Sequence, residues 1–228
     1  MTIQSLKTMV ALLSLGNLMT ACGALNTARP LDKGQHRVGV TGGGAVLTAL
    51  GAPIPLPNLI IEGQSGLAPI QARPLDIHYG LNATAGAFGI IGLHAGASHL
   101  LTAQNGATPA LSVMERVHFY NNWLDSTKEA SVRKGYLLNQ VDLTASWNLS
   151  KHLGYVGIAN YLDVTDPELT LAPFAGLQLN TSKRLFLQAE ARYLAVNRQP
   201  EIVDVSFATL GYGALSVTGS IGFAFGGE

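Results

Sequence analysis

Strict alternation of apolar and polar residues is the sequence feature that most constrains this fold. From Gln140 to Leu149 the chain reads Q-V-D-L-T-A-S-W-N-L, so apolar side chains fall on one face and polar side chains on the other. Because successive side chains of a β-strand point to opposite faces, this period of two predicts a strand with one apolar and one polar face. The same alternation recurs over 75–82, 184–195 and 215–225, and helical spacing fits none of these segments.

Segments of this kind are distributed along most of the chain. They span about 35–47, 57–66, 74–84, 89–101, 109–120, 136–149, 153–161, 169–180, 184–195 and 213–225. Their lengths approach the roughly 9–11 residues that a tilted β-strand needs to cross a bilayer. The sequence therefore predicts an all-β fold, an antiparallel up-and-down β-barrel of about ten strands.

The connections between these segments alternate in length. Short turns are expected at 104–106, 150–152 and 181–183. Longer loops are expected at 48–56, 121–135, 162–168 and 196–212. Transmembrane barrels show this asymmetry, with short turns on one side and long loops on the other. Two places fit the pattern of a regular barrel less well. The join over 85–88 is plain and short for a loop, and Pro173 inside a segment forfeits a ladder hydrogen bond, which predicts a bulge.

The composition indicates a surface that does not wholly face water. Charged residues make up 12% of the chain, about half of the roughly 25% that is usual in soluble domains. The 14 Lys and Arg residues balance the 14 Asp and Glu residues, which argues against a nucleic-acid-binding protein with a clustered basic surface. Alternation alone does not say which face meets water. A soluble lipocalin-like barrel that carries an apolar ligand therefore stays open as an alternative.

The opening stretch of the chain has the organisation of a secretory signal. One cation, Lys7, precedes an apolar run from Met9 to Leu18, and the sequence M-T-A-C then ends at Cys22. The run is too short for a transmembrane helix, which needs about 20 apolar residues. Small residues before a cysteine are what a lipoprotein signal peptidase requires, so we predict cleavage before Cys22 and lipidation of its thiol. An ordinary secretory signal cleaved nearby is the alternative.

The domain organisation follows from this signal. We expect a lipoprotein signal peptide over 1–21, a lipidated N-terminal tether over 22–34 and a single β-barrel domain over 35–228. Cys22 is the only cysteine in the sequence, so no disulfide within the chain and no cysteine-based metal site is expected. The histidines show no close pairing with carboxylates at ligand spacing, and we expect no metal and no cofactor.

Four stretches together resemble small outer-membrane β-barrel lipoproteins of Gram-negative bacteria. They are the lipobox at Cys22, the segment Lys33–Val40, the segment Tyr79–Leu81 and the aromatic final strand Ser216–Phe225. The resemblance is one of architecture, and it brings no assigned activity. It implies an outer-membrane location, with lipid contacts through the diacylglyceryl-cysteine and the barrel exterior. The final strand is similar to the signal read by the barrel-assembly machinery, which implies that machinery as a partner during biogenesis.

If the apolar face meets lipid, the polar face lines the barrel interior and gathers ionisable residues there. These residues are Arg37, Asp76, His78, Arg116, His118, Asp142, Glu190 and Arg192. A barrel of about ten strands is too narrow for an open channel, because about eight strands are just filled by side chains and porins need roughly 16–18. We expect an interior network in which buried charges are paired. A narrow pore, or a luminal site for a small polar ligand, is the alternative.

An outer-membrane lipid-modifying enzyme is a further hypothesis. Barrel enzymes that trim or transfer acyl chains use Ser–His sets, and His94, Ser98 and His99 lie in one segment here, with His118 in the next. Ser98 and His99 are adjacent and point to opposite faces, while Ser98 and His94 are separated by about 13 Å of strand. No third residue is placed to orient a base, so we assign no catalytic residue.

Residues 121–135 are the best candidate for contact with a molecule outside the barrel. Trp123 lies there among charges of both signs, and the proline-rich stretch Pro53–Pro57 would flank it as a stiff loop. Trp123 is either an anchor at the membrane interface or part of a docking loop. Taken together, these patterns predict a lipid-anchored outer-membrane barrel with a structural, interaction or restricted-transport role.

Overall fold

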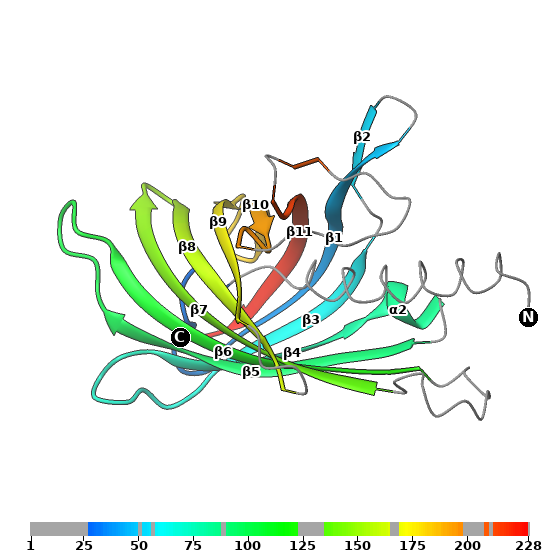
Figure 1. The fold of residues 1–228 in the computed structure, drawn as a ribbon. Helices are drawn as coiled ribbons and strands as arrows, with labels where there is room; N and C mark the ends of the chain where they lie inside the picture. The colour runs from blue at the N-terminus through cyan, green and yellow to red at the C-terminus, as the bar shows by residue number, and fades with distance from the viewer. Residues whose placement is uncertain are drawn as a thin grey trace, which may run out of the picture.

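An antiparallel β-barrel accounts for most of the chain (Figure 1). The computed structural model describes residues 27–49, 52–55, 58–87, 90–122, 135–164, 169–197, 208–209 and 212–227. No helix within these ranges is long and apolar enough to cross a membrane.

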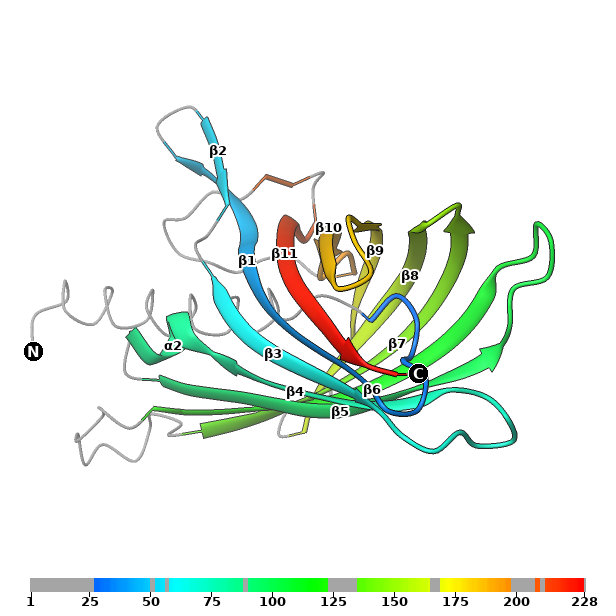
Figure 2. The same ribbon diagram turned by 180° about the vertical axis from the view of Figure 1, so that it is seen from behind.

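The barrel strands follow one another along the chain. They are β1 (Gln35–Ala49), β3 (Leu59–Gly66), β4 (Leu75–Asn82), β5 (Ile90–Thr102), β6 (Ala110–Asn122), β7 (Gly135–Leu149), β8 (His152–Asp163), β9 (Leu169–Asn180), β10 (Leu185–Leu194) and β11 (Ala214–Gly226). Each pairs with its neighbours in this order, and β11 pairs with β1, so these ten of the described strands form a closed barrel. Figure 2 shows the closing strands β1 and β11 side by side. The predicted fold class is confirmed.

A short strand, β2 (Ala52–Pro55), lies where the sequence predicts only a loop over 48–56. β1 pairs with β3 no further than Gly42 and with β11 no further than Ala45, and beyond Ala45 it extends past the barrel wall. The last part of β1 instead pairs with β2, from Val46 opposite Pro55 to Ala49 opposite Ala52. Because unpaired backbone groups are costly, a hairpin gives this extension of β1 its hydrogen-bond partners.

A short helix, α2 (Ala83–Ala87), follows β4 and occupies the join that the sequence left plain. The side-chain oxygen of Asn82 accepts a hydrogen bond from the N–H of Ala85 at 2.9 Å. This is the N-cap arrangement that begins a helix. The connection therefore turns as a helix and needs neither a tight turn nor a long loop.

Pro173 does not mark the bulge that the sequence predicts. It pairs with Ile158 of β8 in a continuous register. The ladder between β9 and β10 begins at Phe174, directly after Pro173. The missing N–H of proline is therefore accommodated where the ladder with β10 ends, and no extra residue is inserted.

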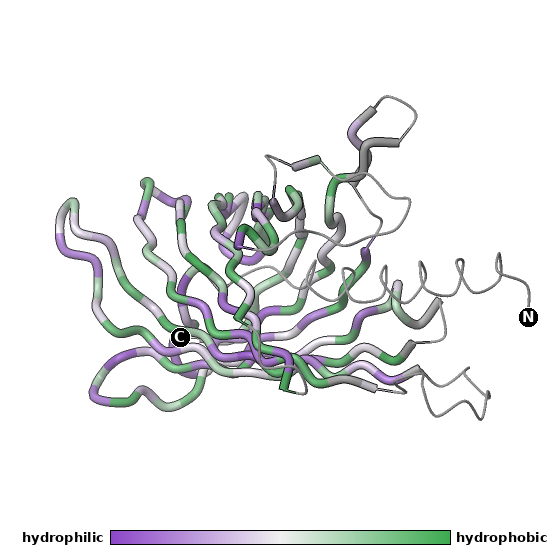
Figure 3. The backbone as a smooth tube through the Cα atoms, in the orientation of Figure 1, coloured by the Kyte–Doolittle hydropathy of each residue, from purple (hydrophilic) through white to green (hydrophobic). Residues whose placement is uncertain are grey.

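The apolar faces of the strands point outward and the polar faces point inward. In β7, Val141 and Leu143 are 38% and 48% exposed, whereas Asp142 and Thr144 are 0% and 2% exposed. Figure 3 shows hydrophobic and hydrophilic positions alternating along the strands. Other large apolar residues exposed around the barrel are Val38, Ile61, Tyr79, Leu93, Phe119, Val156, Leu177, Leu187 and Ile221. This polarity is opposite to that of a lipocalin-like carrier.

The segment before β1 and the C-terminal end of the described chain meet at one end of the barrel. The N–H of Gly227 donates to the carbonyl oxygen of Gly34 at 2.9 Å. We call this the hairpin end, because the hairpins β3–β4, β5–β6, β7–β8 and β9–β10 also turn there. Two of these hairpins extend to the left in Figure 1, and α2 lies at the opposite end, the loop end.

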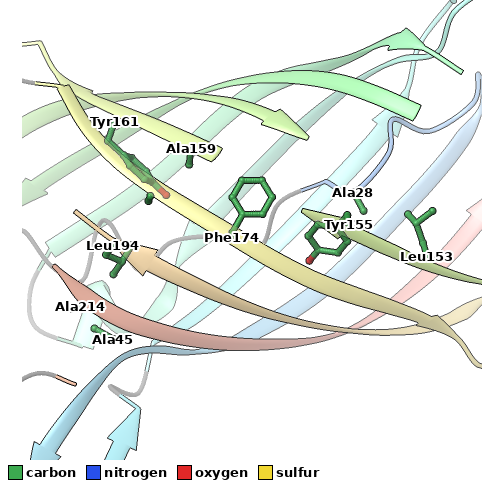
Figure 4. Packing of buried hydrophobic residues seen from close by; sticks show 10 residues of the cluster. Ala28, Ala45, Leu153, Tyr155, Ala159, Tyr161, Phe174, Leu194 and Ala214 are labelled. Atoms are coloured by element: carbon green, nitrogen blue, oxygen red, sulfur yellow. The ribbon is translucent and has the colours of Figure 1, made fainter. Parts of the chain in front are cut away.

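A small apolar core lies inside the barrel (Figure 4). It consists of Ala28, Ala45, Leu153, Tyr155, Ala159, Tyr161, Ala172, Phe174, Leu194 and Ala214. The rings of Tyr155 and Phe174 lie 6.2 Å apart between centroids. Most members are alanines or tyrosines, so the core leaves room for the many polar groups that are also buried.

Candidate functional site

The structure places all eight ionisable residues predicted for the polar face on the inward side of the barrel wall. Arg37 comes from β1, Asp76 and His78 from β4, Arg116 and His118 from β6, Asp142 from β7, and Glu190 and Arg192 from β10. They lie in three parts of the interior. Arg37 and Asp76 are toward the hairpin end, four residues lie on β4, β6 and β7, and Glu190 and Arg192 lie on β10.

Asp76 connects the N-terminal segment to the barrel wall. One carboxylate oxygen accepts a hydrogen bond from the N–H of Leu31 at 2.7 Å. The side chains of Gln64 and Ser98 also donate to this carboxylate. Asp76 is fully buried, and hydrogen bonds to a charged acceptor are stronger than those between neutral groups. This carboxylate therefore holds three separate pieces of chain together.

Residues 27–34, which the sequence assigns to a tether, pack into the barrel at the hairpin end. Ala28 and Leu31 are buried, and Arg29 donates to Asn148 at 2.9 Å. Partial burial lowers the pKa of the Arg29 guanidinium, which nevertheless stays charged at neutral pH. A Cβ atom on Gly66 would lie 1.9 Å from the carbonyl oxygen of Asp32, so this close approach requires glycine.

A hydrogen-bonded chain connects β6 to β7 inside the barrel. The Nε2 of His118 lies 2.8 Å from the Oε1 of Gln140, and because that oxygen is an acceptor, His118 donates. The amide nitrogen of Gln140 donates in turn to Asp142 at 2.7 Å. The Nε of Arg116, also on β6, donates to the Nδ1 of His78 on β4 at 3.3 Å. These polar side chains are fixed by one another and leave little freedom for rearrangement.

Glu190 and Arg192 form an ion pair in the interior. The guanidinium donates to one Glu190 oxygen at 2.7 and 3.1 Å, and the hydroxyl of Tyr155 donates to the other at 3.1 Å. Arg192 also donates to the hydroxyl of Tyr161 and lies 5.5 Å from the centroid of the Phe174 ring. Buried charges persist only when they are paired and hydrogen-bonded, and this group satisfies that condition.

Sequence reasoning missed Glu62, which faces the interior from β3. Its carboxylate accepts a hydrogen bond from the hydroxyl of Thr41 at 2.6 Å. Glu62 was missed because this segment does not alternate cleanly: apolar Ile60, which is 2% exposed, lies on the same inward face. The signal available was the shared parity of Glu62 and Gln64, both of which point inward.

Buried side chains occupy much of the described interior. A cavity of about 40 Å³ lies between Arg37, Glu62, His78, Arg116 and Gln188. A single water needs roughly 10–15 Å³ of such volume, so the cavity has room for only a few water molecules. This volume is much smaller than an aqueous channel through the barrel would need.

The structure does not assemble the serine and histidine residues into a catalytic set. Ser98 donates to Asp76, and His94 instead lies beside His118, with ring centroids 5.6 Å apart. Neither contact activates a serine hydroxyl through histidine. Within the described ranges, no group of three His, Cys, Asp or Glu residues could hold a metal ion.

One Ser–His pair was not anticipated from the sequence. The Nδ1 of His36 lies 3.0 Å from the Oγ of Ser65, and the two residues are direct cross-strand partners on the outer face. The ring of His36 stacks on Phe225, with centroids 5.4 Å apart. No carboxylate in the described part of the chain hydrogen-bonds this pair, so it lacks the third group of a triad.

Two predicted functional positions fall outside the described residues. Cys22 with the signal peptide precedes residue 27, and Trp123 lies within 123–134. Lipidation at Cys22 and a contact through Trp123 therefore stay predictions from the sequence.

Comparison with known proteins gives little guidance on function. The sequence matches no protein-family model and no curated protein. Among solved structures, the chain is similar to the translocator domain of the autotransporter NalP from Neisseria meningitidis, with a TM-score of 0.47 and 10% sequence identity. The match covers 96% of this chain and 97% of that one. A likeness at this level leaves the function to be argued from the residues of the barrel itself.

Proposed function

We propose that this protein is a lipid-anchored outer-membrane β-barrel with a structural or interaction role. The observation that carries the proposal is the inverted polarity of the barrel. Apolar side chains such as Leu143 and Ile221 are exposed, whereas Asp142, Glu190 and Arg192 are buried. A soluble barrel would reverse this arrangement, because burying apolar area gains roughly 25 cal/mol per Å² and burying charge is costly.

Closure of the barrel supports the same proposal. In the hydrocarbon core of a bilayer, backbone N–H and C=O groups find no water, so only helices and closed barrels span membranes. Pairing of β11 with β1 removes the sheet edges that would otherwise be left open. The strands around the barrel are mostly longer than the roughly 9–11 residues needed to cross a bilayer.

Aromatic residues near both ends of the barrel wall also support membrane insertion. Phe223 and Phe225 lie on the outer face near the hairpin end, and Phe119 lies on the outer face near the loop end. The hydroxyl of Tyr193, near the end of β10, donates to the carbonyl oxygen of Tyr212 at 2.6 Å. Aromatic girdles at both interfaces are typical of transmembrane barrels.

The filled interior favours a structural or interaction role over transport. The ion pair of Glu190 and Arg192 and the chain from His118 to Asp142 occupy the lumen. These side chains lie in the way of any solute that would cross the lumen. A lipid-modifying activity has no supporting Ser–His–acid arrangement among the described residues.

A lipid on Cys22 would give the barrel a second anchor in the membrane. Thr27 begins the described chain five positions after Cys22. At roughly 3.3–3.6 Å per extended residue, that distance is at most about 18 Å. Cys22 would therefore lie within about 18 Å of Thr27, which lines the interior cavity beside Arg37 and Glu62.

The test is heat-modifiable electrophoretic mobility of protein extracted from outer membranes, with a Cys22→Ala variant beside the wild type. We expect both proteins in the membrane fraction, with a folded band that changes mobility only after boiling. Release of Cys22→Ala into the soluble fraction would overturn membrane insertion, since the lipid alone would then hold a water-soluble barrel. Identical membrane-extraction behaviour with no lipid mass on Cys22 would overturn only the anchor.

A further inference from the structure

A groove at the hairpin end is lined by cations and by no described carboxylate. Its volume is about 790 Å³, within the range of roughly 300–1,000 Å³ that is usual for ligand sites. Its described lining residues are Leu31, Gln35, His36, Arg37, Lys151, Asn180, Thr181, Ser182, Lys183, Arg184, Leu185, Phe186, Ala224, Phe225, Gly226 and Gly227. The groove lies at the mouth of the barrel, apart from the interior ion pairs.

The four cations of the groove come from three separate parts of the chain. Arg37 lies in β1, Lys151 in the β7–β8 turn, and Lys183 and Arg184 in the β9–β10 turn. A concave surface lined by charges of one sign concentrates the field and raises the local concentration of a ligand of opposite sign. The charge of this groove therefore fits an anion.

Arg37 forms the inner end of the groove and is already held in position. Its guanidinium lies 5.0 Å above the centroid of the Phe186 ring, and one terminal nitrogen donates to Gln178 at 3.3 Å. Its buried Nε has no hydrogen-bond partner among the described residues. A fixed guanidinium with donors to spare is the group that binds phosphate best, because its planar fork matches two phosphate oxygens.

The walls of the groove are fixed before any ligand binds. The side chain of Asn180 donates to the carbonyl oxygen of Lys151 at 2.7 Å, which joins the two basic turns. Ser182 accepts from the N–H of Leu185 at 2.9 Å and so closes the β9–β10 turn. On the opposite side, Gly226 has a φ of 73°, and a Cβ there would lie 2.2 Å from the carbonyl oxygen of Gly34. Such preorganisation lowers the entropic cost of binding.

Apolar side chains border the same groove. Leu185 and Phe225 are exposed at its rim, and Leu31 and Phe186 lie at its inner side. A cationic floor beside an apolar rim suits a ligand that carries a phosphate on an apolar tail.

We propose that this groove binds a phosphate group, as the headgroup of an anionic amphiphile. Binding of phosphate in the groove does not depend on the proposed membrane location. Only the identification of the phosphate as part of a phospholipid rests on that location. Free phosphate shares the same chemistry, so the test has to separate the two sources.

The test compares two double variants of the full-length protein folded in uncharged detergent micelles. Lys151→Gln with Lys183→Gln removes two cations that line the groove. Lys33→Gln with Arg73→Gln removes two exposed cations from the same end that do not line it. Each protein is titrated with inorganic phosphate and, separately, with monomeric dihexanoylphosphatidylglycerol, and binding is followed by calorimetry. Heat-modifiable mobility shows that each variant is folded.

We expect the groove variant to bind phosphatidylglycerol at least tenfold more weakly than the wild type, and the control variant to bind within about twofold of it. Binding of phosphatidylglycerol with no binding of inorganic phosphate supports a lipid headgroup. Binding of inorganic phosphate alone, lost in the groove variant, supports the phosphate site and overturns the amphiphile. Equal weakening in both variants would overturn the site, because general electrostatic attraction would then explain the binding, and no binding of either probe would overturn it as well. None of these outcomes depends on membrane insertion, because the titrations are done in detergent micelles without a membrane.

Discussion

At the scale of single residues, the interior charges are the most demanding feature of this barrel. Glu190 and Arg192 lie in a closed lumen and satisfy each other with help from Tyr155 and Tyr161. A buried pair of this kind contributes little net stability compared with an apolar pair of similar volume. Removing only one partner is strongly destabilising, because it leaves an uncompensated buried charge.

Arg192→Gln is therefore expected to destabilise the barrel strongly. The free energy of unfolding should fall by about 3–5 kcal/mol, the usual cost of breaking a buried ion pair from one side. Urea unfolding of the protein folded into lipid vesicles measures this change. The double variant Glu190→Gln, Arg192→Gln should lose less than Arg192→Gln alone, since both charges are then absent.

Arg184→Gln serves as the matched control for this prediction. Arg184 is exposed, and surface substitutions usually change stability by no more than about 0.5 kcal/mol. If Arg192→Gln lowered the free energy of unfolding no more than Arg184→Gln does, breaking the interior ion pair would not destabilise the barrel, contrary to the prediction.

At the scale of elements, the segment 27–34 behaves as part of the barrel. Its main attachment is the hydrogen bond from the N–H of Leu31 to Asp76, supported by the contact of Arg29 with Asn148. A hydrogen bond to a charged group contributes roughly 1.5–3 kcal/mol. Detachment of the segment should therefore be controlled largely by one carboxylate.

Asp76→Ala is expected to release this segment without unfolding the barrel. Loss of roughly 1.5–3 kcal/mol raises the detached fraction by about ten- to a hundredfold. Trypsin should then cleave after Lys33 faster than in the wild type, as followed by mass spectrometry. Asp142→Ala deletes an equally buried carboxylate that makes no described contact with the segment. Equal acceleration in both variants would mean that the barrel as a whole had loosened.

The outer face of β7 gives a second prediction at this scale. Leu143 lies near the middle of the strand, and Leu149 lies at its hairpin end. In lipid, Leu143→Arg should lower the free energy of unfolding by about 2–4 kcal/mol, whereas Leu149→Arg should lower it by about 0–1 kcal/mol. Urea titration in vesicles of uncharged lipid measures both values. Two equally small losses would indicate that the outer face of β7 meets water.

Most of the elements could be predicted from the sequence because a strand with two unlike faces leaves a pattern of period two. β7 and β10 begin and end within one residue of the expected ranges, and their inward residues are those on the polar face. β2 and α2 could not be predicted in this way. Their formation depends on where β1 separates from β3 and on one capping contact of Asn82, and neither is a periodic signal.

The interior residues could be predicted in part, for the same reason. Parity places Asp142 and Arg192 in the lumen, but parity does not say which side chains meet across it. The contacts of Arg192 with Tyr161 and Phe174 join β10 to β8 and β9. Such contacts depend on the closed curvature of the sheet, which the linear sequence does not contain.

At the scale of the whole molecule, the filled lumen predicts that the barrel does not conduct ions. The remaining cavity near Arg116 has a volume of only about 40 Å³. Purified protein inserted into planar bilayers should give no discrete conductance steps, and a porin measured alongside verifies that the bilayer detects channels. Regular steps of a fixed size would contradict the structural role and favour restricted transport.

Site-directed spin labelling tests most directly whether the outer face of the barrel meets lipid. Cys22 is the only cysteine in the sequence, so a Cys22→Ala background accepts single cysteines cleanly. Nitroxide labels at Val141, Leu143 and Val156 would report accessibility to lipid-soluble oxygen and to a water-soluble nickel complex in vesicles. We predict high collision with oxygen and low collision with nickel at all three, and low collision with both at Thr144, which points inward. High collision with nickel at Val141, Leu143 and Val156 would contradict the account, because it would place these apolar side chains in water.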